Sequence, residues 1–458
     1  MDATECPRGT KRVYFGHNAC LNSSYDFKLV EEGMRRAGFS IVNRPEDADE
    51  IIFSGCSVRE IWVEDAAKQI NAMLSRAPSA TVVVTGCVAN VCAARIKALV
   101  KTDKLIFNSQ EKLLRGYTGL DLANVDKDFV QDGSLDYEGI KDGFAQIRKR
   151  VGPEKANAVA ALQKIDRAHG TQLESRYRRI TKGFVLYQEQ DPVEFITVSR
   201  SCPYTCSFCA IPKGRGEYSS VPLGLILAKA KAALARGVRH VVLLGDEVGN
   251  YGAGTDVRFA GMMEALVNLD EKLRISIRYL EPKPFLRNAA LVQRLCYEGR
   301  VELLYVSLQS GSQQVLHAMN RFAGIDDLAV QFEELRHNSD TVLYSNWMVG
   351  FPGETNSDFA ETITLMQRLN LHINMAIPFS PRPDTPALAM EAQVDEREKE
   401  RRFRELVRVA ADMKVAAFTP HLKFLDVRDR DALLDLIRAG ELVQYEDLVD
   451  DRDPEAEV

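Results

Sequence analysis

The chain has 458 residues, of which 45% are hydrophobic and 27% charged, with a net charge of −6. This length predicts two or three domains, and the net charge argues against a broad nucleic-acid-binding face. No apolar run approaches the roughly 18 residues that cross a bilayer, and the polar N-terminus predicts no secretory signal. We therefore expect a cytoplasmic protein whose nine cysteines serve metals or catalysis rather than disulfides.

Residues 1–110 form the first predicted domain. Strand and helix signals alternate there, and the strands are continuous and apolar, as buried parallel strands should be. The predicted strands and helices are 13–15, 26–38, 50–54, 61–74 and 81–85. This order is typical of a doubly wound α/β domain.

Residues 111–192 are polar and predicted to be helical. Between residues 141 and 182, eleven lysines and arginines stand against four acids. The simplest interpretation is a solvated basic linker. The alternative is an arm that grips an acidic partner.

Residues 193–392 return to alternating strands and helices. The predicted strands are 195–199, 240–244, 274–280, 303–308, 342–349 and 372–379. Six such units predict a partial (β/α)6 barrel, whose chemistry belongs on loops at the carboxyl ends of the strands. Residues 393–458 are predicted to be a helical C-terminal extension with an acidic tail.

A first cysteine set, Cys202, Cys206 and Cys209, has the spacing C-x3-C-x2-C and follows a predicted strand. Three such thiolates suit three corners of a 4Fe-4S cube and leave the fourth iron open. Zinc would need a fourth ligand at metal-binding spacing, and none follows. The motif and its context resemble the radical S-adenosylmethionine superfamily. This resemblance implies that the open iron binds S-adenosylmethionine, whose cleavage gives a 5′-deoxyadenosyl radical.

The same resemblance implies further cofactor-binding residues near strand ends. Glu247 would accept hydrogen bonds from the methionine ammonium, and Asp246 stands where the family has a second glycine. Phe208 would pack near the adenine, and Arg321 would hold the cofactor or the substrate. The expected cofactor-binding set is Phe208, Gly245, Asp246, Glu247, Gln309, Ser310 and Arg321.

A second cysteine set consists of Cys20, Cys56 and Cys87, each placed just after a predicted strand of the first domain. Carboxyl ends of parallel strands meet at one edge of a sheet, which is the ligand-binding edge of such folds. Gly55 and Gly86 would allow close approach of the backbone. We therefore predict a second, auxiliary 4Fe-4S cluster with an open iron, with all six cysteines catalytic.

Together the two sets resemble the methylthiotransferase family, which installs CH3–S– on tRNA adenosine or on a ribosomal-protein aspartate. The match runs from about Tyr14 to Met390. The family's motifs stand here as Cys20-Leu-Asn22, Cys56-Ser-Val-Arg59, Gly86-Cys87-Val-Ala89, Ile211-Pro-Lys-Gly-Arg215-Gly216, Gln309-Ser-Gly-Ser312, Met319-Asn-Arg321, Gly350-Phe-Pro-Gly-Glu354 and Ser380-Pro-Arg-Pro383-Asp-Thr-Pro386.

This resemblance implies two 4Fe-4S clusters, with S-adenosylmethionine as both methyl donor and radical source. It also implies a reducing partner such as flavodoxin or ferredoxin, and no membrane partner. The chain departs from the family in lacking an evident TRAM domain, a small β-barrel, after residue 393. We therefore expect a peptide or protein substrate, such as a ribosomally made precursor peptide.

Three alternatives remain open at this point. The first is tRNA, whose phosphates the basic segment 141–182 would contact. The second is a cobalamin-dependent radical methylase, although the chain has no Asp-x-His-x-x-Gly motif and that reading leaves Cys20, Cys56 and Cys87 without a role. The third is a non-catalytic iron–sulfur protein, which would not need the cofactor-binding elements.

Overall fold

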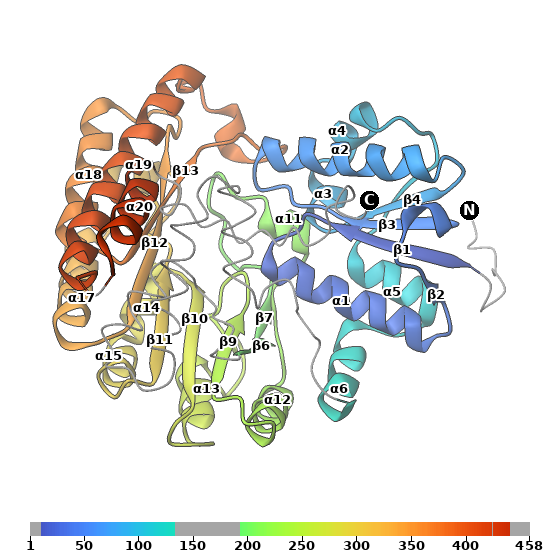
Figure 1. Ribbon diagram of the computed structural model, residues 1–458, viewed down its shortest axis with the longest axis horizontal. Helices are drawn as coiled ribbons and strands as arrows, with labels where there is room; N and C mark the ends of the chain where they lie inside the picture. Colours follow the sequence, from blue (N-terminus) through green and yellow to red (C-terminus); the bar gives the residue numbers. More distant parts are fainter. Residues whose placement is uncertain (1–10, 133–192, 424, 440–458) are drawn as a thin grey trace.

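The computed structural model describes residues 11–132, 193–423 and 425–439. Two parallel sheets lie next to each other, the first in blue at the right of Figure 1 and the second in green to orange at the centre. The basic segment 141–182 and the acidic tail lie outside the described residues. No helix in the described part of the chain has the length and apolar character of a membrane span.

The first sheet has five parallel strands in the order β2-β1-β3-β4-β5. Helices α1 and α5 pack on one face through Phe27, Val30 and Leu113, and α2 packs on the other through Val63 and Ile70. The elements are β1 (Arg12–His17), α1 (Leu21–Arg36), β2 (Ser40–Ile41), β3 (Glu50–Ser54), α2 (Glu60–Arg76), β4 (Thr81–Thr85), α3 (Cys87–Val91), α4 (Ala93–Leu99), β5 (Leu105–Phe107), α5 (Gln110–Thr118) and α6 (Leu122–Asp132).

The second sheet has six parallel strands in the order β13-β12-β11-β10-β9-β6. The strands are β6 (Val193–Thr197), β9 (His240–Leu244), β10 (Arg274–Leu280), β11 (Val301–Val306), β12 (Val342–Val349) and β13 (Ile373–Pro378). The helices between them are α12 (Leu223–Ala235), α13 (Phe259–Val267), α14 (Pro282–Arg287), α15 (Ala289–Tyr297), α16 (Gln313–Ala318), α17 (Ile325–Asn338) and α18 (Asn356–Leu369). The predicted fold class, a doubly wound domain followed by a partial (β/α)6 barrel, is confirmed.

The barrel's outward-facing residues alternate with inward-facing ones, as parallel barrels require. Ile275 and Ile277 of β10 pack with the surrounding helices in the largest apolar core. Tyr305 and Tyr344 of the neighbouring strands stack on the inner side, with ring centroids 4.0 Å apart. The strands are therefore covered on both faces, which explains their nearly continuous apolar sequences.

The two sheets share a core. Phe195 and Leu244 of the barrel pack in one apolar cluster with Phe27 of α1. Beside this cluster, Lys229 of α12 makes a buried ion pair with Asp126 of α6. The two parts of the chain are therefore joined by both apolar packing and buried charge.

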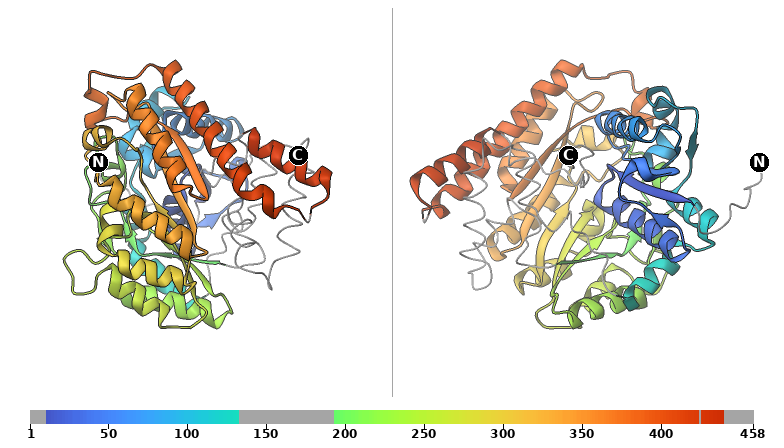
Figure 2. Two further views of the ribbon diagram at one scale, coloured as in Figure 1. Left: turned by 90° about the vertical axis from the view of Figure 1, so that its left-hand side faces the viewer. Right: turned by 45° about the vertical axis from the view of Figure 1, so that its right-hand side comes forward.

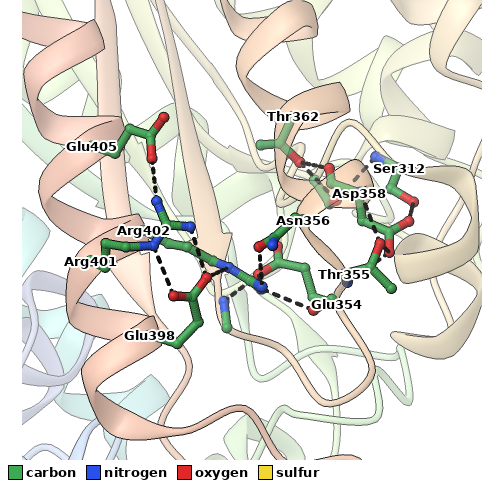
Figure 3. A network of polar contacts seen from close by, with 12 residues as sticks. Ser312, Glu354, Thr355, Asn356, Asp358, Thr362, Glu398, Arg401, Arg402 and Glu405 are labelled. Carbon is green, nitrogen blue, oxygen red and sulfur yellow. Dashed lines mark hydrogen bonds and ion pairs between the residues drawn. The ribbon is translucent and has the colours of Figure 1, made fainter.

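Two helices follow the barrel, α19 (Glu396–Phe418) and α20 (Val427–Arg438), and they pack side by side (Figure 2). Figure 3 shows how α19 is attached. Arg402 donates to buried Glu354 at 2.7 Å, and Glu354 also accepts from the Gly350 amide at 2.6 Å. Arg402 therefore fixes the turn that follows β12.

Replacing Arg402 with Met should destabilise the protein far more than replacing its neighbour Arg401. The Arg402 side chain is 5% exposed. Its loss would leave Glu354 as an unpaired buried charge, which costs about 3–5 kcal/mol. Arg401 is 50% exposed and pairs with acids on its own helix, so its loss should cost less than about 1 kcal/mol. Chemical denaturation of the anaerobic, cluster-loaded protein measures both, and equal effects would contradict this assignment.

Candidate active site

The second cysteine set gathers at one edge of the first sheet. The strands β1, β3 and β4 are adjacent and parallel, and Cys20, Cys56 and Cys87 follow their carboxyl ends. Cys20 is the N-cap of α1 and Cys87 is the first residue of α3. The thiols of Cys20 and Cys56 lie close enough to Cys87 for their charges to raise its pKa, although burial is the larger cause. The structure thus brings this predicted set together.

Two glycines make this edge possible. A Cβ added to Gly55 would lie 2.4 Å from Val88, the residue after Cys87. Gly86 has a φ of +74°, and a Cβ there would lie 2.8 Å from the Gly55 carbonyl oxygen. Since only glycine takes such a conformation without strain, the loops that carry Cys56 and Cys87 can approach closely.

The first cysteine set lies on the loop between β7 (Ser199–Arg200) and α11 (Ile211–Arg215). Burial raises the pKa of the Cys209 thiol to about 12, and burial likewise raises the pKa of Cys202 and of Cys206. Opposing this, Arg321 lowers the pKa of Cys206, and its Nη1 lies 3.7 Å from Cys206 Sγ. Such thiols stay protonated unless a metal or a fixed positive charge favours the thiolate.

Arg321 is held in place by two further groups. Its Nη1 donates to Glu281 at 2.8 Å, and its Nη2 donates to the Ser307 carbonyl. The side chain is almost fully buried. The structure therefore places this predicted cofactor-binding residue directly against one cysteine of the first set.

The segment after β9 contains two acids with different surroundings. The Glu247 carboxylate turns back on its own loop and accepts from the amides of Gly249 and Asn250 at 2.7 and 2.8 Å. Burial raises the pKa of Glu247 to about 7. The Asp246 carboxylate points instead toward the first sheet, where Asn22 donates to it at 3.3 Å. Gly245 packs tightly against Ser199.

The segment after β11 holds two neighbouring polar side chains with different surroundings, Gln309 and Ser310. Gln309 has a φ of +71°, and in the described residues its buried Oε1 has no hydrogen-bond partner. Ser310 hydroxyl contacts Thr362 hydroxyl at 3.2 Å and supports the turn. Phe208 packs against Phe351, with ring centroids 6.5 Å apart. Of these, Gln309 offers the atom most suited to a ligand's donor group.

Helix α11 connects the two cysteine sets. At its start, the Ile211 amide donates to Cys209 Sγ at 3.4 Å. Three residues later, Gly214 packs on the other set, because a Cβ there would lie 3.2 Å from Cys87 Sγ. Three residues of helix span only about 5 Å. The sequence showed each cysteine set, but nothing in it placed α11 between them.

Each cysteine set has three thiols, the number of protein ligands in a 4Fe-4S cluster with one open iron. None of the cysteines in the described residues forms a disulfide. Among the same residues, no three His, Cys, Asp or Glu side chains come close enough to hold one metal ion. A cube places each thiolate on a different iron, so its ligands stand farther apart than those of a zinc ion. Each set also has a buried arginine whose charge acts on its thiols, Arg215 at Cys87 and Arg321 at Cys206.

Two family models match the chain. Residues 196–366 match the Radical SAM superfamily, and residues 12–108 match Uncharacterized protein family UPF0004. A tRNA-2-methylthio-N(6)-dimethylallyladenosine synthase from Paracoccus denitrificans is 26% identical over 388 residues, covering 82% of this chain and 76% of that protein. A synthase of the same name from Ralstonia nicotianae is 28% identical over 389 residues, covering 82% and 76%.

The chain belongs to the radical S-adenosylmethionine methylthiotransferase family. It is an enzyme of this class, and membership implies 4Fe-4S clusters and S-adenosylmethionine as cofactors. The resemblance drawn from the two cysteine sets is thereby confirmed. In this methylthiotransferase, the segment that matches UPF0004 forms the sheet that carries Cys20, Cys56 and Cys87.

Solved structures agree on the fold. The radical S-adenosylmethionine methyltransferase TsrM from Kitasatospora setae, with cobalamin and a [4Fe-4S] cluster bound, aligns with a TM-score of 0.53. The alignment has 13% sequence identity and covers 83% of this chain and 77% of that one. At this identity the likeness shows a shared fold only.

Replacing Gly214 with Val should remove one cluster and leave the other. The added side chain would push α11 off Cys87, whereas the set Cys202, Cys206 and Cys209 contacts α11 at its opposite end, through the Ile211 amide. Iron should fall from about eight to about four per chain. Gly224→Val is the control, because no atom lies within 4 Å of a Cβ at Gly224. Full iron in the Gly214 variant would contradict the tight packing.

Proposed function

We propose that this methylthiotransferase modifies a carbon of a peptide or protein. Cys20, Cys56 and Cys87 would hold the auxiliary cluster, and Cys202, Cys206 and Cys209 the cluster that binds S-adenosylmethionine. The observation that carries the two-cluster reading is α11, which contacts one cysteine of each set. Sulfur and radical source are then close enough to act on one carbon.

When bound, the two clusters and S-adenosylmethionine supply a carbon-centred radical and a methylated sulfur. The chain's own residues orient and shield these groups. Arg321 sets a positive charge against Cys206, and Gln309 offers a buried acceptor at the end of β11. Of the six cysteines, Cys56 is buried and the other five are only partly exposed, which limits the access of water to a reactive radical.

The surface of α19 supports a peptide rather than RNA. Binding RNA requires lysines and arginines that are free to neutralise phosphates. Three exposed arginines of α19 instead pair with acids of the same helix. They are Arg401, Arg404 and Arg408. The part of the chain described after β13 is helical and holds no strand, so it offers no β-barrel for RNA.

The second candidate substrate is tRNA. It is favoured by the relatives, which are named as synthases of a methylthiolated tRNA adenosine. The basic segment 141–182 would then contact phosphates. Under either proposal, we expect a cytoplasmic enzyme that is reduced by a flavodoxin or ferredoxin.

Removing each cysteine set separately tests the cluster assignment. The triple variants Cys20→Ala/Cys56→Ala/Cys87→Ala and Cys202→Ala/Cys206→Ala/Cys209→Ala should each keep about four irons per chain. Only the first should still cleave S-adenosylmethionine to 5′-deoxyadenosine. Iron analysis and product chromatography after anaerobic reconstitution give the answer. Loss of all iron in either variant would refute two independent clusters.

Isotope transfer identifies the substrate class. Reconstituted enzyme is incubated with dithionite, sulfide, a lysate of its source organism and S-adenosylmethionine that carries a CD3 group. We expect the label in material that protease digests and RNase does not, with one hydrogen replaced by CH3S, a gain of about 46 Da before deuterium is counted. The barrel triple variant is the control. Label that RNase releases as a nucleoside would overturn the peptide proposal in favour of tRNA.

A further inference from the structure

Four charged side chains, three of them buried and Arg200 partly exposed, form a chain beside both cysteine sets. Asp26 of α1 accepts from Arg200 Nε at 3.0 Å and from Arg215 Nη2 at 2.8 Å. Arg215 Nε then donates to Asp246 at 3.1 Å. Two arginines and two aspartates cancel, so the chain is neutral as a whole. Charges this deeply buried are tolerated only when they are paired in this way.

Of these four side chains, Arg215 has the largest electrostatic effect on Cys87 of the second cysteine set. It closes α11, one residue after the glycine that touches Cys87, and its side chain is only 7% exposed. Its charge lowers the pKa of Cys87, against the larger effect of burial. Cys87 and Cys20 in turn favour the charged guanidinium. Within the described residues, Nη1 of Arg215 donates no hydrogen bond, so it can donate to a sulfur ligand.

Asp246 supplies the contact that a glycine could not. It stands where the resembled element has its second glycine. Its Oδ2 accepts from Arg215 and from the Ser201 amide at 2.8 Å, and its Oδ1 accepts from Asn22. Ser201 has a φ of +65° and directly precedes Cys202. One carboxylate therefore holds the arginine at one cysteine set and the strained residue before the other.

We propose that Arg215 is a positioning residue for the auxiliary cluster, fixed by Asp26 and Asp246 so that its positive charge stabilises the cluster's reduced, more negative form. The proposal depends on the assignment of Cys20, Cys56 and Cys87 as cluster ligands, and not on the identity of the substrate. Its consequence is that the two partners of one ion pair act on the cluster with opposite sign.

The test is an EPR-monitored redox titration of the full chain with dithionite. The background is Cys202→Ala/Cys206→Ala/Cys209→Ala, so that only the auxiliary cluster is observed. Arg215→Met removes a positive charge and should shift the midpoint potential to more negative values. Asp246→Asn removes a negative charge, which also acts on Cys87, and should shift it to less negative values.

Arg200→Met is the matched control. Arg200 also donates to Asp26, but its charge is not among the largest effects on the pKa of Cys87. We expect its midpoint potential to stay near that of the background. Arg215→Lys keeps the positive charge but loses the second donor of the guanidinium. Its midpoint potential should also stay near that of the background.

The direction of the shifts decides between a positioning and a merely structural role. Shifts of the same sign in Arg215→Met and Asp246→Asn, or an equal shift in Arg200→Met, would overturn the proposal. If Arg215→Met holds no cluster, Arg215→Lys carries the test, and loss of the cluster there too would overturn it. A background protein without iron would instead refute the cysteine assignment under the proposed function.

Discussion

The contact between α11 and α3 fixes how far apart the two cysteine sets lie. The Ile211 amide donates to Cys209, and Gly214 packs on Cys87 only because it has no side chain. Asn90 of α3 strengthens the contact by donating to the Gly214 carbonyl at 2.9 Å. A short helix is stiff, so the separation of the sets cannot drift. A radical source and a sulfur donor that act on one carbon need such a fixed distance, because a misplacement of 1 Å lowers the rate steeply.

The rest of the molecule keeps α3 and α11 in register. Phe27 shares a core with Phe195 and Leu244, and Lys229 pairs with Asp126 at the same junction. The charged chain from Arg200 to Asp246 also crosses this junction. Apolar packing stabilises the junction. The buried ion pairs fix the orientation of its two sides, because each carboxylate accepts from one arrangement of donors.

The C-terminal helices serve the barrel rather than the cysteines. Arg402 of α19 reaches Glu354 in the turn after β12, and this turn lies beside the segment of Gln309 because Gln309 pairs with Trp347. The exposed arginines of α19 form ion pairs with acids of their own helix. The helix therefore supports the cofactor side of the barrel and presents a balanced surface to solvent.

The sequence by itself determined the fold class, the family and both cysteine sets, because strand periodicity and short cysteine spacing are local signals. Strands 240–244, 274–280 and 342–349 were predicted with the bounds that the structure has. Short β2 and β5 were missed, and α1 begins at Leu21, five residues before the predicted start, which makes Cys20 its N-cap. Only the tertiary structure placed Arg215 and Asp246 between the sets and turned Glu247 onto its own loop. The contacts of Asp246 join residues as far apart in the chain as Asn22, 224 positions away, and no local pattern encodes them.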